Sequence, residues 1–452
     1  MLFLKFTRDP KEPSAQLYER SAANSPEFSR QNKGLMRFTP KCVDRQLTLP
    51  CYILLLLVAF TASGCGRGVQ TAAAQSAPIS VPPVDSDSDS ADSKTKSSVS
   101  NEEATTFGND LATVIRTKDS KKAGQLIAWR EIVKRAVAPF KVDKKTKDQL
   151  IQGAMTTVPQ VTDNLSDSVA KGGNYQLVHV KRRSGYPFAL FRFLDANGSF
   201  NYNLLRIRKV KGVVMADQFF NASTGEEMSD TFRNALAPGV QSLSWVGRLT
   251  GAQKRFFEDI EAQKNMVTAI TAGKKQEALK IYDQMRPKLK KAKLSMLYRI
   301  MATSVEDEAA YATAVDEYLE AFPDDAAVGL ITLDAGAIRK DADLLIKSHQ
   351  SLNKWTGGDP YLDLIIGANL VAIDRNDLAV KLTKSIDPAT VGIASAHDFK
   401  LAVGLAVKDH AEVLKQLRVL RDEFGLQFSD LSKAEGFEDF AKSPQHEQWK
   451  ND

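Results

Sequence analysis

The sequence predicts an α+β domain, in which helices pack on a four-stranded antiparallel meander, followed by an all-α domain of repeated helical pairs. Three observations predict this architecture. Apolar residues recur every three or four positions between 107 and 170 and then alternate with a period of two between 176 and 220. From about residue 251 to the end the helical period returns and repeats along the chain. Ahead of residue 107 stand one short apolar segment and a long polar stretch.

The segment CYILLLLVAFTASGC, residues 51–65, indicates export. Its apolar core is shorter than the roughly 20 residues of a membrane-spanning helix and fits the roughly 7–15 apolar residues of a signal peptide. The run Ala62-Ser63-Gly64-Cys65 resembles the lipobox of bacterial lipoproteins, although Ala62 stands where that family has leucine. The resemblance implies that Cys65 is lipidated. Secretion after cleavage near Ala62 and an uncleaved anchor are the alternatives.

A leader of residues 36–64 would have ordinary length, so residues 1–35 are predicted to be a mis-assigned N-terminal extension. Cleavage removes Cys42 and Cys51 and leaves Cys65 as the single cysteine. No disulfide and no cysteine-based metal or redox site is therefore expected. The resemblance implies a protein exported and lipid-anchored to the bacterial membrane, at the periplasmic face or in the outer membrane.

The charge of the chain argues against nucleic acid as a partner. Residues 1–64 carry nine of the 61 basic and five of the 55 acidic residues, so that 52 basic and 50 acidic residues remain, a net charge of +2. Residues 65–106 follow, rich in Ser, Asp, Thr, Ala and Pro and without an aromatic residue. This composition predicts a disordered tether. Calcium binding or phosphorylation at its Ser-Asp repeats is the alternative.

Residues 107–240 are predicted to form the α+β domain. Helices precede four strands at about 176–180, 186–194, 200–208 and 213–220, and a short helix at 226–236 follows them. Short turns join the strands, which favours an antiparallel meander. One sheet face is expected to lie under the helices, and the other under another segment or open as a pocket. The order of elements resembles the architecture of cystatin-like and ketosteroid-isomerase-like cones.

Polar side chains on or beside these strands are the candidates for chemistry. If the cone holds a catalytic site or binds a small molecule, Asp217 is the general base, with Arg192 and Arg206 in the pocket. The favoured interpretation is a cross-strand ion pair between Asp217 and an arginine, which fixes the register of the sheet. Asp195 lies in a turn sequence and needs no further role.

The region 251–452 is predicted to contain five helical pairs that begin near 252, 290, 326, 359 and 391, a spacing of about 32–38 residues. Leu364-Ile-Ile-Gly367, Ala379 and Asp387-Pro388 resemble the tetratricopeptide repeat, whose small residues let two helices touch and whose proline ends the second helix. The resemblance implies a solenoid with a surface that holds a peptide or a protein domain. A plain helical bundle is the alternative.

The expected function is that of a cell-envelope lipoprotein scaffold, with a protein or peptide partner on the repeat surface and the membrane contacted through the lipid anchor. No cofactor and no enzymatic activity are expected, because the chain has no P-loop, no nucleophile elbow and no histidine pair at metal-ligand spacing. The alternatives are a small-molecule binder or enzyme using the cone, and pairing of subunits through the sheet. The aromatic tail, Phe437, Phe440 and Trp449, is predicted to cap the solenoid; a docking motif is the alternative.

Overall fold

The computed structural model describes residues 99–140, 142–195, 198–243, 251–303, 307–323, 325 and 327–452. They form two compact units. The N-terminal unit comprises the described residues from Val99 to Ile331 together with residues 354–357, and the C-terminal unit comprises residues 332–353 and 358–452. The division therefore does not fall between 240 and 251, where the sequence suggests a domain boundary. Within the described ranges, no helix has both the length and the apolar character that a membrane span requires.

The first helix, α1 (Asn101–Arg116), begins earlier than predicted. Ser100 Oγ accepts a hydrogen bond from the backbone N–H of Glu103 at 3.0 Å, and the backbone N–H of Ser100 donates to Glu103 Oε2 at 2.8 Å. This reciprocal pair is a capping box, which satisfies two backbone donors at a helix start. Residues 101–106, assigned to the tether from their composition, are therefore helical.

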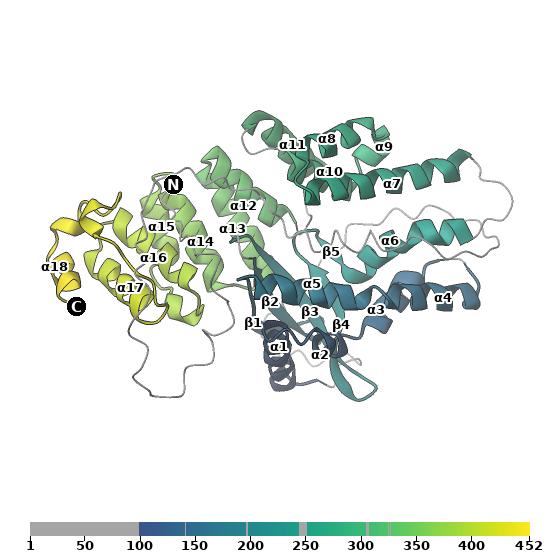
Figure 1. Cartoon of the computed structure of the whole chain (residues 1–452), viewed down its shortest axis with the longest axis horizontal. Helices are drawn as coiled ribbons and strands as arrows, with labels where there is room; N and C mark the ends of the chain where they lie inside the picture. Colours follow the sequence, from purple (N-terminus) through teal and green to yellow (C-terminus); the bar gives the residue numbers. More distant parts are fainter. Residues whose placement is uncertain are drawn as a thin grey trace, which may run out of the picture. The chain divides into compact units, whose positions relative to one another are not determined.

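Four more helices precede the sheet: α2 (Ser120–Leu126), α3 (Trp129–Val137), α4 (Lys144–Met155) and α5 (Val158–Ala170). The predicted meander is confirmed, because the antiparallel strands lie in sequential order with a two-residue strand added at the edge (Figure 1). The strands are β1 (Asn174–Arg183), β2 (Tyr186–Leu194), β3 (Phe200–Val210), β4 (Val213–Asn221) and β5 (Glu226–Glu227). Two turns, Ser184-Gly185 and Lys211-Gly212, have positive φ at both residues, as tight hairpins require.

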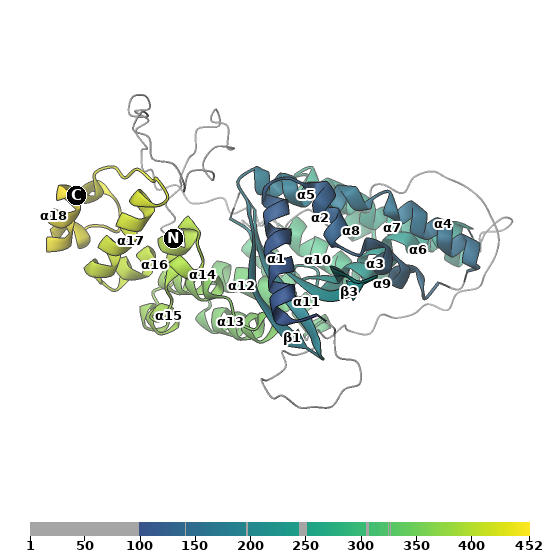
Figure 2. The same ribbon diagram turned by 90° about the horizontal axis from the view of Figure 1, so that it is seen from below.

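One face of the sheet packs against helices, as predicted. Helix α1 lies along β1 and β2 (Figure 2). The core on this side includes Phe191, Leu205 and Ile207, which are almost fully buried. The ring of Tyr175 stacks on that of Phe191 with centroids 4.9 Å apart. This face therefore supplies the main apolar core of the N-terminal unit.

The opposite face carries Tyr202 and Phe220, which alternate with the core residues along their strands. Their ring centroids lie 6.3 and 5.3 Å from that of Trp355. Arg183 on β1 donates a hydrogen bond from Nη2 to the carbonyl oxygen of Trp355. Residues 354–357 thus cover the aromatic part of this face, which was predicted to be either covered or open.

Helix α6 (Met228–Leu243) begins two residues later than predicted, because Glu226 and Glu227 pair with β4 as strand β5. Phe232 of α6 packs edge-on against Trp129 of α3, with ring centroids 6.2 Å apart. The unit continues with α7 (Gly251–Thr271), α8 (Lys275–Gln284), α9 (Pro287–Lys290), α10 (Lys293–Ala302) and α11 (Glu308–Ala321).

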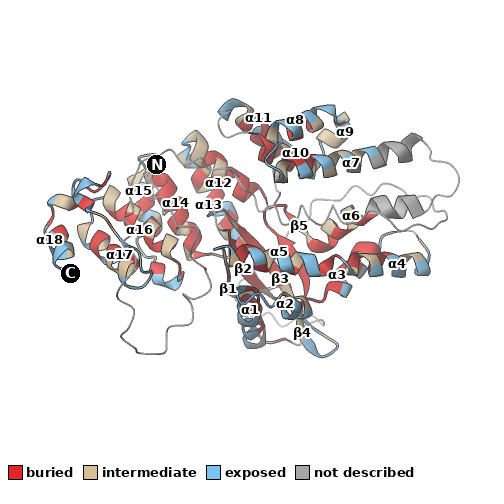
Figure 3. Ribbon diagram, viewed as in Figure 1, coloured by how far each residue is buried: buried red, intermediate tan, exposed pale blue. Residues whose placement is uncertain are grey.

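The remaining helices are α12 (Val328–Arg339), α13 (Ala342–Thr356), α14 (Pro360–Val371), α15 (Asn376–Thr383), α16 (Ala394–Ala406), α17 (His410–Asp422) and α18 (Pro444–Asn451). The predicted helical pairs are present at the predicted places. Helix α14 is buried along most of its length (Figure 3), which fits its apolar character on all sides. Where α14 meets α15, Gly367 leaves no room for a side chain, because a Cβ would collide with Thr383 Cγ2.

The second helices of the pairs begin at a regular interval. Their starts follow one another at spacings of 33, 34, 34 and 34 residues: Lys275, Glu308, Ala342, Asn376 and His410. In the C-terminal unit each start follows the same turn, in which one residue has left-handed φ: Lys340 (54°), Asp374 (61°) and Lys408 (59°). The next N–H donates at 2.9 Å to the carbonyl oxygen five residues earlier, on Gly336, Leu370 and Gly404 respectively. This is the hydrogen bond that closes a Schellman turn.

The aromatic tail packs as a cap, which confirms the favoured prediction. Phe437 and Phe440 are 2% and 1% exposed and belong to one cluster with residues of α16 and α17. Trp449 packs against the same cluster, and the guanidinium of Arg421 lies 4.7 Å from the centroid of its ring.

The left-handed turn residue yields a stability prediction. Lys340→Gly should raise the free energy of unfolding by up to about 1 kcal/mol, because glycine adopts this φ without the Cβ clash that lysine has. The matched control is Lys347→Gly, which changes an exposed lysine inside α13 and should lower the free energy by about 1 kcal/mol. Denaturant unfolding followed by circular dichroism measures both. Equal signs for the two variants would contradict the turn assignment.

Candidate functional site

The predicted lipidation site, Cys65, lies outside the described residues. Among the strand candidates, Asp217 is the most connected. Its carboxylate accepts from Arg206 Nε at 2.8 Å and Nη2 at 3.1 Å, and it lies 3.4 Å from Arg208 Nη1 and 3.5 Å from Arg135 Nη1 of α3. The interpretation of Asp217 as a cross-strand ion pair is confirmed. Three guanidinium groups surround the carboxylate of Asp217, and its side chain is only 4% exposed.

A β-bulge places this carboxylate. The register between β3 and β4 shifts at this point: Arg206 pairs with Gln218, but the next residue, Ile207, pairs with Ala216. Asp217 is therefore the extra residue of β4. The bulge therefore gathers Asp217 and Arg206 at one point of the sheet.

Arg192 does not join them. It stands opposite Tyr202 on β3, four residues from Arg206 and thus roughly 13 Å along the strand. Its Nη2 donates to Gln176 Oε1 at 2.8 Å. Asp195 lies in a turn as predicted, where its carboxylate accepts from the backbone N–H of Ser199 at 2.9 Å.

A second charged network joins the start of β5 to α10. Lys293 Nζ forms an ion pair with Asp325 Oδ2 at 2.5 Å and donates to the carbonyl oxygen of Gly225 at 2.9 Å. The hydroxyl of Tyr318 donates to Asp325 Oδ1 at 3.1 Å. Gly225 has a φ of 61°, and a Cβ there would collide with Asp325 Oδ1. Any other residue would have both to adopt this left-handed φ and to displace the side chain of Asp325.

Glu226 lies beside this network and has an unusual acidity. Its pKa is raised from 4.5 to about 7, chiefly because the carboxyl group is buried; the nearby Lys293 opposes this rise, and the carboxylates of Asp230 and Asp325 contribute to it. A carboxyl with this pKa can exchange a proton at neutral pH, as catalytic acids and bases do. Glu226 does not line the pocket described next, and its chemistry here is a protonation coupled to folding.

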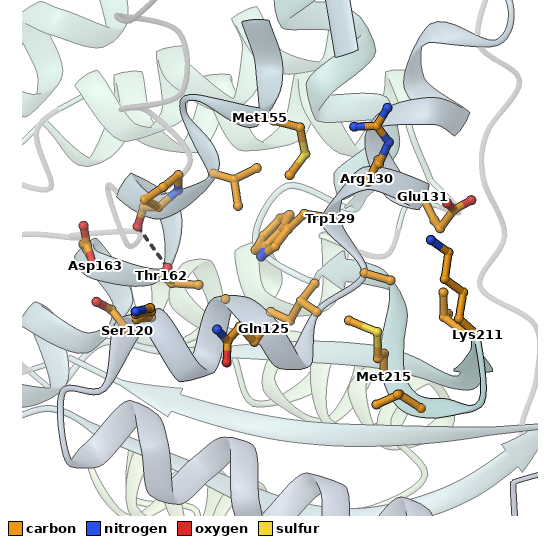
Figure 4. Close-up of a pocket in the computed structure, with 18 residues that line it drawn as sticks. Ser120, Gln125, Trp129, Arg130, Glu131, Met155, Thr162, Asp163, Lys211 and Met215 are labelled. Carbon is orange, nitrogen blue, oxygen red and sulfur yellow. Dashed lines mark hydrogen bonds between the residues drawn. The ribbon is translucent and has the colours of Figure 1, made fainter. Parts of the chain in front are cut away.

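A pocket of about 650 Å³ lies between α2, α3, α5 and the β3–β4 hairpin (Figure 4). This volume is within the roughly 300–1,000 Å³ typical of small-molecule sites. Its walls are mainly apolar, with Ile127, Met155, Val158, Val213 and Met215 among the lining residues. None of the predicted candidates Asp217, Arg192 and Arg206 lines it.

Trp129 stands in this pocket at the first residue of α3 (Figure 4). The preceding linker is tied to the sheet, because the backbone N–H of Ala128 donates to the carbonyl oxygen of Ala216 at 2.7 Å. Trp129 is 3% exposed, yet its Nε1–H has no hydrogen-bond acceptor among the described residues. A buried donor without an acceptor is uncommon and costs about 1–3 kcal/mol.

Basic residues outnumber acidic ones around the pocket. Lys121, Arg130 and Lys211 line it, are exposed, and form no ion pair with any residue in the described part of the chain. Of the two acidic lining residues, Glu131 is paired with Lys134 at 2.7 Å, and Asp163 is exposed. An anion in the pocket would therefore meet a favourable field.

The sequence identified Trp129 only as part of an apolar helical stripe. A tryptophan in such a stripe predicts burial, and nothing in the local sequence indicates that its nitrogen lacks an acceptor. Comparison with known protein families, with curated proteins and with solved structures finds no match to the chain.

The raised pKa of Glu226 predicts a pH dependence of stability. Protonated Glu226 favours the folded state, so this contribution is full below pH 4.5 and is lost as the pH rises through about 7. Glu226→Gln should therefore flatten the fall in unfolding free energy over that range, as measured by urea unfolding at stepped pH.

Asp398, in the C-terminal unit, also has its pKa raised by burial to about 7, and burial raises the pKa of Glu227 as well, so the change is made in an Asp398→Asn, Glu227→Gln background. Glu258→Gln, at an exposed position of α7, is the matched control. A slope unchanged by Glu226→Gln would show that Glu226 titrates normally.

Proposed function

We propose that this protein is a bacterial cell-envelope lipoprotein, anchored through acylated Cys65, that acts as a protein-binding scaffold through a tetratricopeptide-like repeat. The observation that carries the scaffold proposal is the start of successive second helices every 33–34 residues, the last three of them after turns of one kind. Tetratricopeptide repeats are helical pairs with a period of 34 residues. The anchoring proposal rests on the segment 51–65.

The repeat places equivalent side chains on its second helices. Lys347, Lys381 and Lys415 are each 34 residues apart, on α13, α15 and α17 of the C-terminal unit. All three are exposed and form no ion pair with a described residue. Asp343 and Asp377 stand one helical turn before the first two, so the surface carries both signs of charge. Such a surface suits a protein segment of mixed charge rather than a polyanion.

The anchor is tested by the intact mass of the protein from its native membrane. We expect a chain that starts at Cys65 and carries acyl mass. Cys65→Ala should abolish the acylated species and move the protein to the soluble fraction, because the acyl chains are its attachment. Ser63→Ala, which keeps the cysteine and a small residue near the cleavage site, is the control. A native chain that retains residues 36–64 would refute the proposal.

The scaffold is tested by photocrosslinking in cells with the lipidated full chain. A photoreactive residue placed at 347, 381 or 415 should give the same discrete heterologous adduct, because a partner that follows the repeat contacts successive second helices. The same residue at Gln152, exposed on α4, is the control and should not give that adduct. Charge reversal at the two lysines that remain should remove the adduct while thermal unfolding is unchanged. Absence of adducts from all three positions would reject this surface.

A further inference from the structure

We propose that one end of the sheet in the N-terminal unit docks on the anionic phospholipid headgroups of a bilayer. This hairpin end comprises residues 99–103, 182–186 and 206–213. The proposal deepens the anchoring proposal above and rests on it, because it gives the anchored protein a second contact with its membrane. Three features support it: where the N-terminal chain enters the fold, which charges gather there, and an exposed valine at the tip.

The β1–β2 and β3–β4 turns lie at the same end of the sheet, because the strands follow one another in antiparallel order. The last pair of the first hairpin is Arg183 with Tyr186, and that of the second is Val210 with Val213. From the register of β2 on β3, the second hairpin extends two residues further, roughly 7 Å. Residues 211–213 are exposed (Figure 3). The β3–β4 turn is therefore the part of the sheet that projects furthest at this end.

The chain from Cys65 enters the fold at the hairpin end. Arg182 Nη2 donates a hydrogen bond to the carbonyl oxygen of Val99 at 2.8 Å. Lys209 Nζ lies 2.9 Å from Glu103 Oε1, which joins the first turn of α1 to β3. Along the chain, 33 residues separate Cys65 from Val99. Acylation of Cys65 would hold this end at a high effective concentration near the bilayer, so that even a weak contact is populated.

The charges at the hairpin end are mainly positive. The sequence has no acidic residue in 171–194 or in 196–216. Arg182 donates to two backbone carbonyl oxygens, and neither it nor Lys211 forms an ion pair with a residue in the described ranges. Around Asp217, three guanidinium groups face one carboxylate, which leaves positive charge in excess. An anionic surface would therefore be attracted to this end.

Three acidic residues oppose this attraction. Glu103 is paired with Lys209, Asp217 is 4% exposed, and Glu102 is exposed. The basic side chains at the tip are more accessible, since that of Arg208 is 46% exposed and Lys211 is exposed as well. Each basic side chain close to an anionic bilayer strengthens binding about fivefold. The few cations of this end therefore suit a protein that is already held at the membrane.

The tip also carries apolar surface, which distinguishes a bilayer from a purely polar polyanion. Val213 is 60% exposed although it is apolar, and it stands two residues from Lys211. Tyr186 lies behind it, with the guanidinium of Arg208 5.3 Å from the centroid of its ring. An apolar side chain beside basic ones matches the boundary between headgroups and acyl chains. A nucleic acid would leave the valine without a favourable contact.

The test uses the full chain carrying Cys65→Ala, which has no acyl group, and measures cosedimentation with phosphatidylglycerol vesicles at low salt. Lys209→Gln with Lys211→Gln should weaken binding by at least about tenfold. The matched control, Lys144→Gln with Lys145→Gln, removes the same charge from exposed positions at the start of α4 and should have little effect. Val213→Ser should weaken binding by about threefold. Circular dichroism checks that each variant is folded.

A second readout reports where the tip lies. An environment-sensitive fluorescent amino acid at position 213 should shift its emission to the blue when the vesicles are added. The same residue at Gln152, exposed on α4, should show no shift. Because both assays use unacylated protein, their results are independent of the intact mass that tests the anchor.

The outcomes separate the possible occupants. Binding that is weakened by the tip lysines, with a blue shift at 213, supports the proposal. Equal binding to phosphatidylcholine vesicles, equal loss in the two lysine pairs, or no binding at low salt would overturn it. Binding that appears only after Asp85, Asp87 and Asp89 are changed to Asn would assign the hairpin end to the acidic segment of this chain, and would also overturn it.

Discussion

The placement of α3 on the sheet of the N-terminal unit depends on one backbone hydrogen bond, between the N–H of Ala128 and the carbonyl oxygen of Ala216. Through it the short linker between α2 and α3 pairs with the sheet at a single point. Because α3 starts at the next residue, the bond fixes where that helix leaves the sheet. Trp129 is thereby set in the pocket, and Arg135 is carried to within reach of Asp217. The pocket and the ion pairs share this constraint.

Strand β4 pairs with β3 on one edge, and on its other edge it has two different partners along its length. Before the bulge Ala216 meets Ile127, and beyond it Phe220 and Asn221 pair with β5. The extra residue at the change is Asp217, which lies among arginines from both β3 and α3. Both halves of this edge are thus protected by short pairings, which limits the chance of pairing with another chain.

The local pattern of the sequence was enough to predict the meander and the helical pairs, because strand alternation and helical stripes depend on near neighbours. The start of α1 was not predicted, although Ser100 and Glu103 have the residue types and the spacing of a capping box. The left-handed turns were not predictable, since Lys340 and Lys408 are not turn residues by type. The charged network and the pocket depend on residues far apart in sequence, such as Glu226 with Asp325 and Trp129 with Met215, which no local pattern connects.

The turns of the C-terminal unit are closed by bonds between residues only five positions apart, at Gly336, Leu370 and Gly404. Each helical hairpin can therefore form early, with little loop-closure entropy to overcome. A structure made of such segments loses order by fraying from an unprotected end rather than in one step. Phe437 and Phe440 close the C-terminal end of the chain against α16 and α17. Their burial sets how readily the last hairpin opens, and hence how long the chain resists proteases that attack frayed ends.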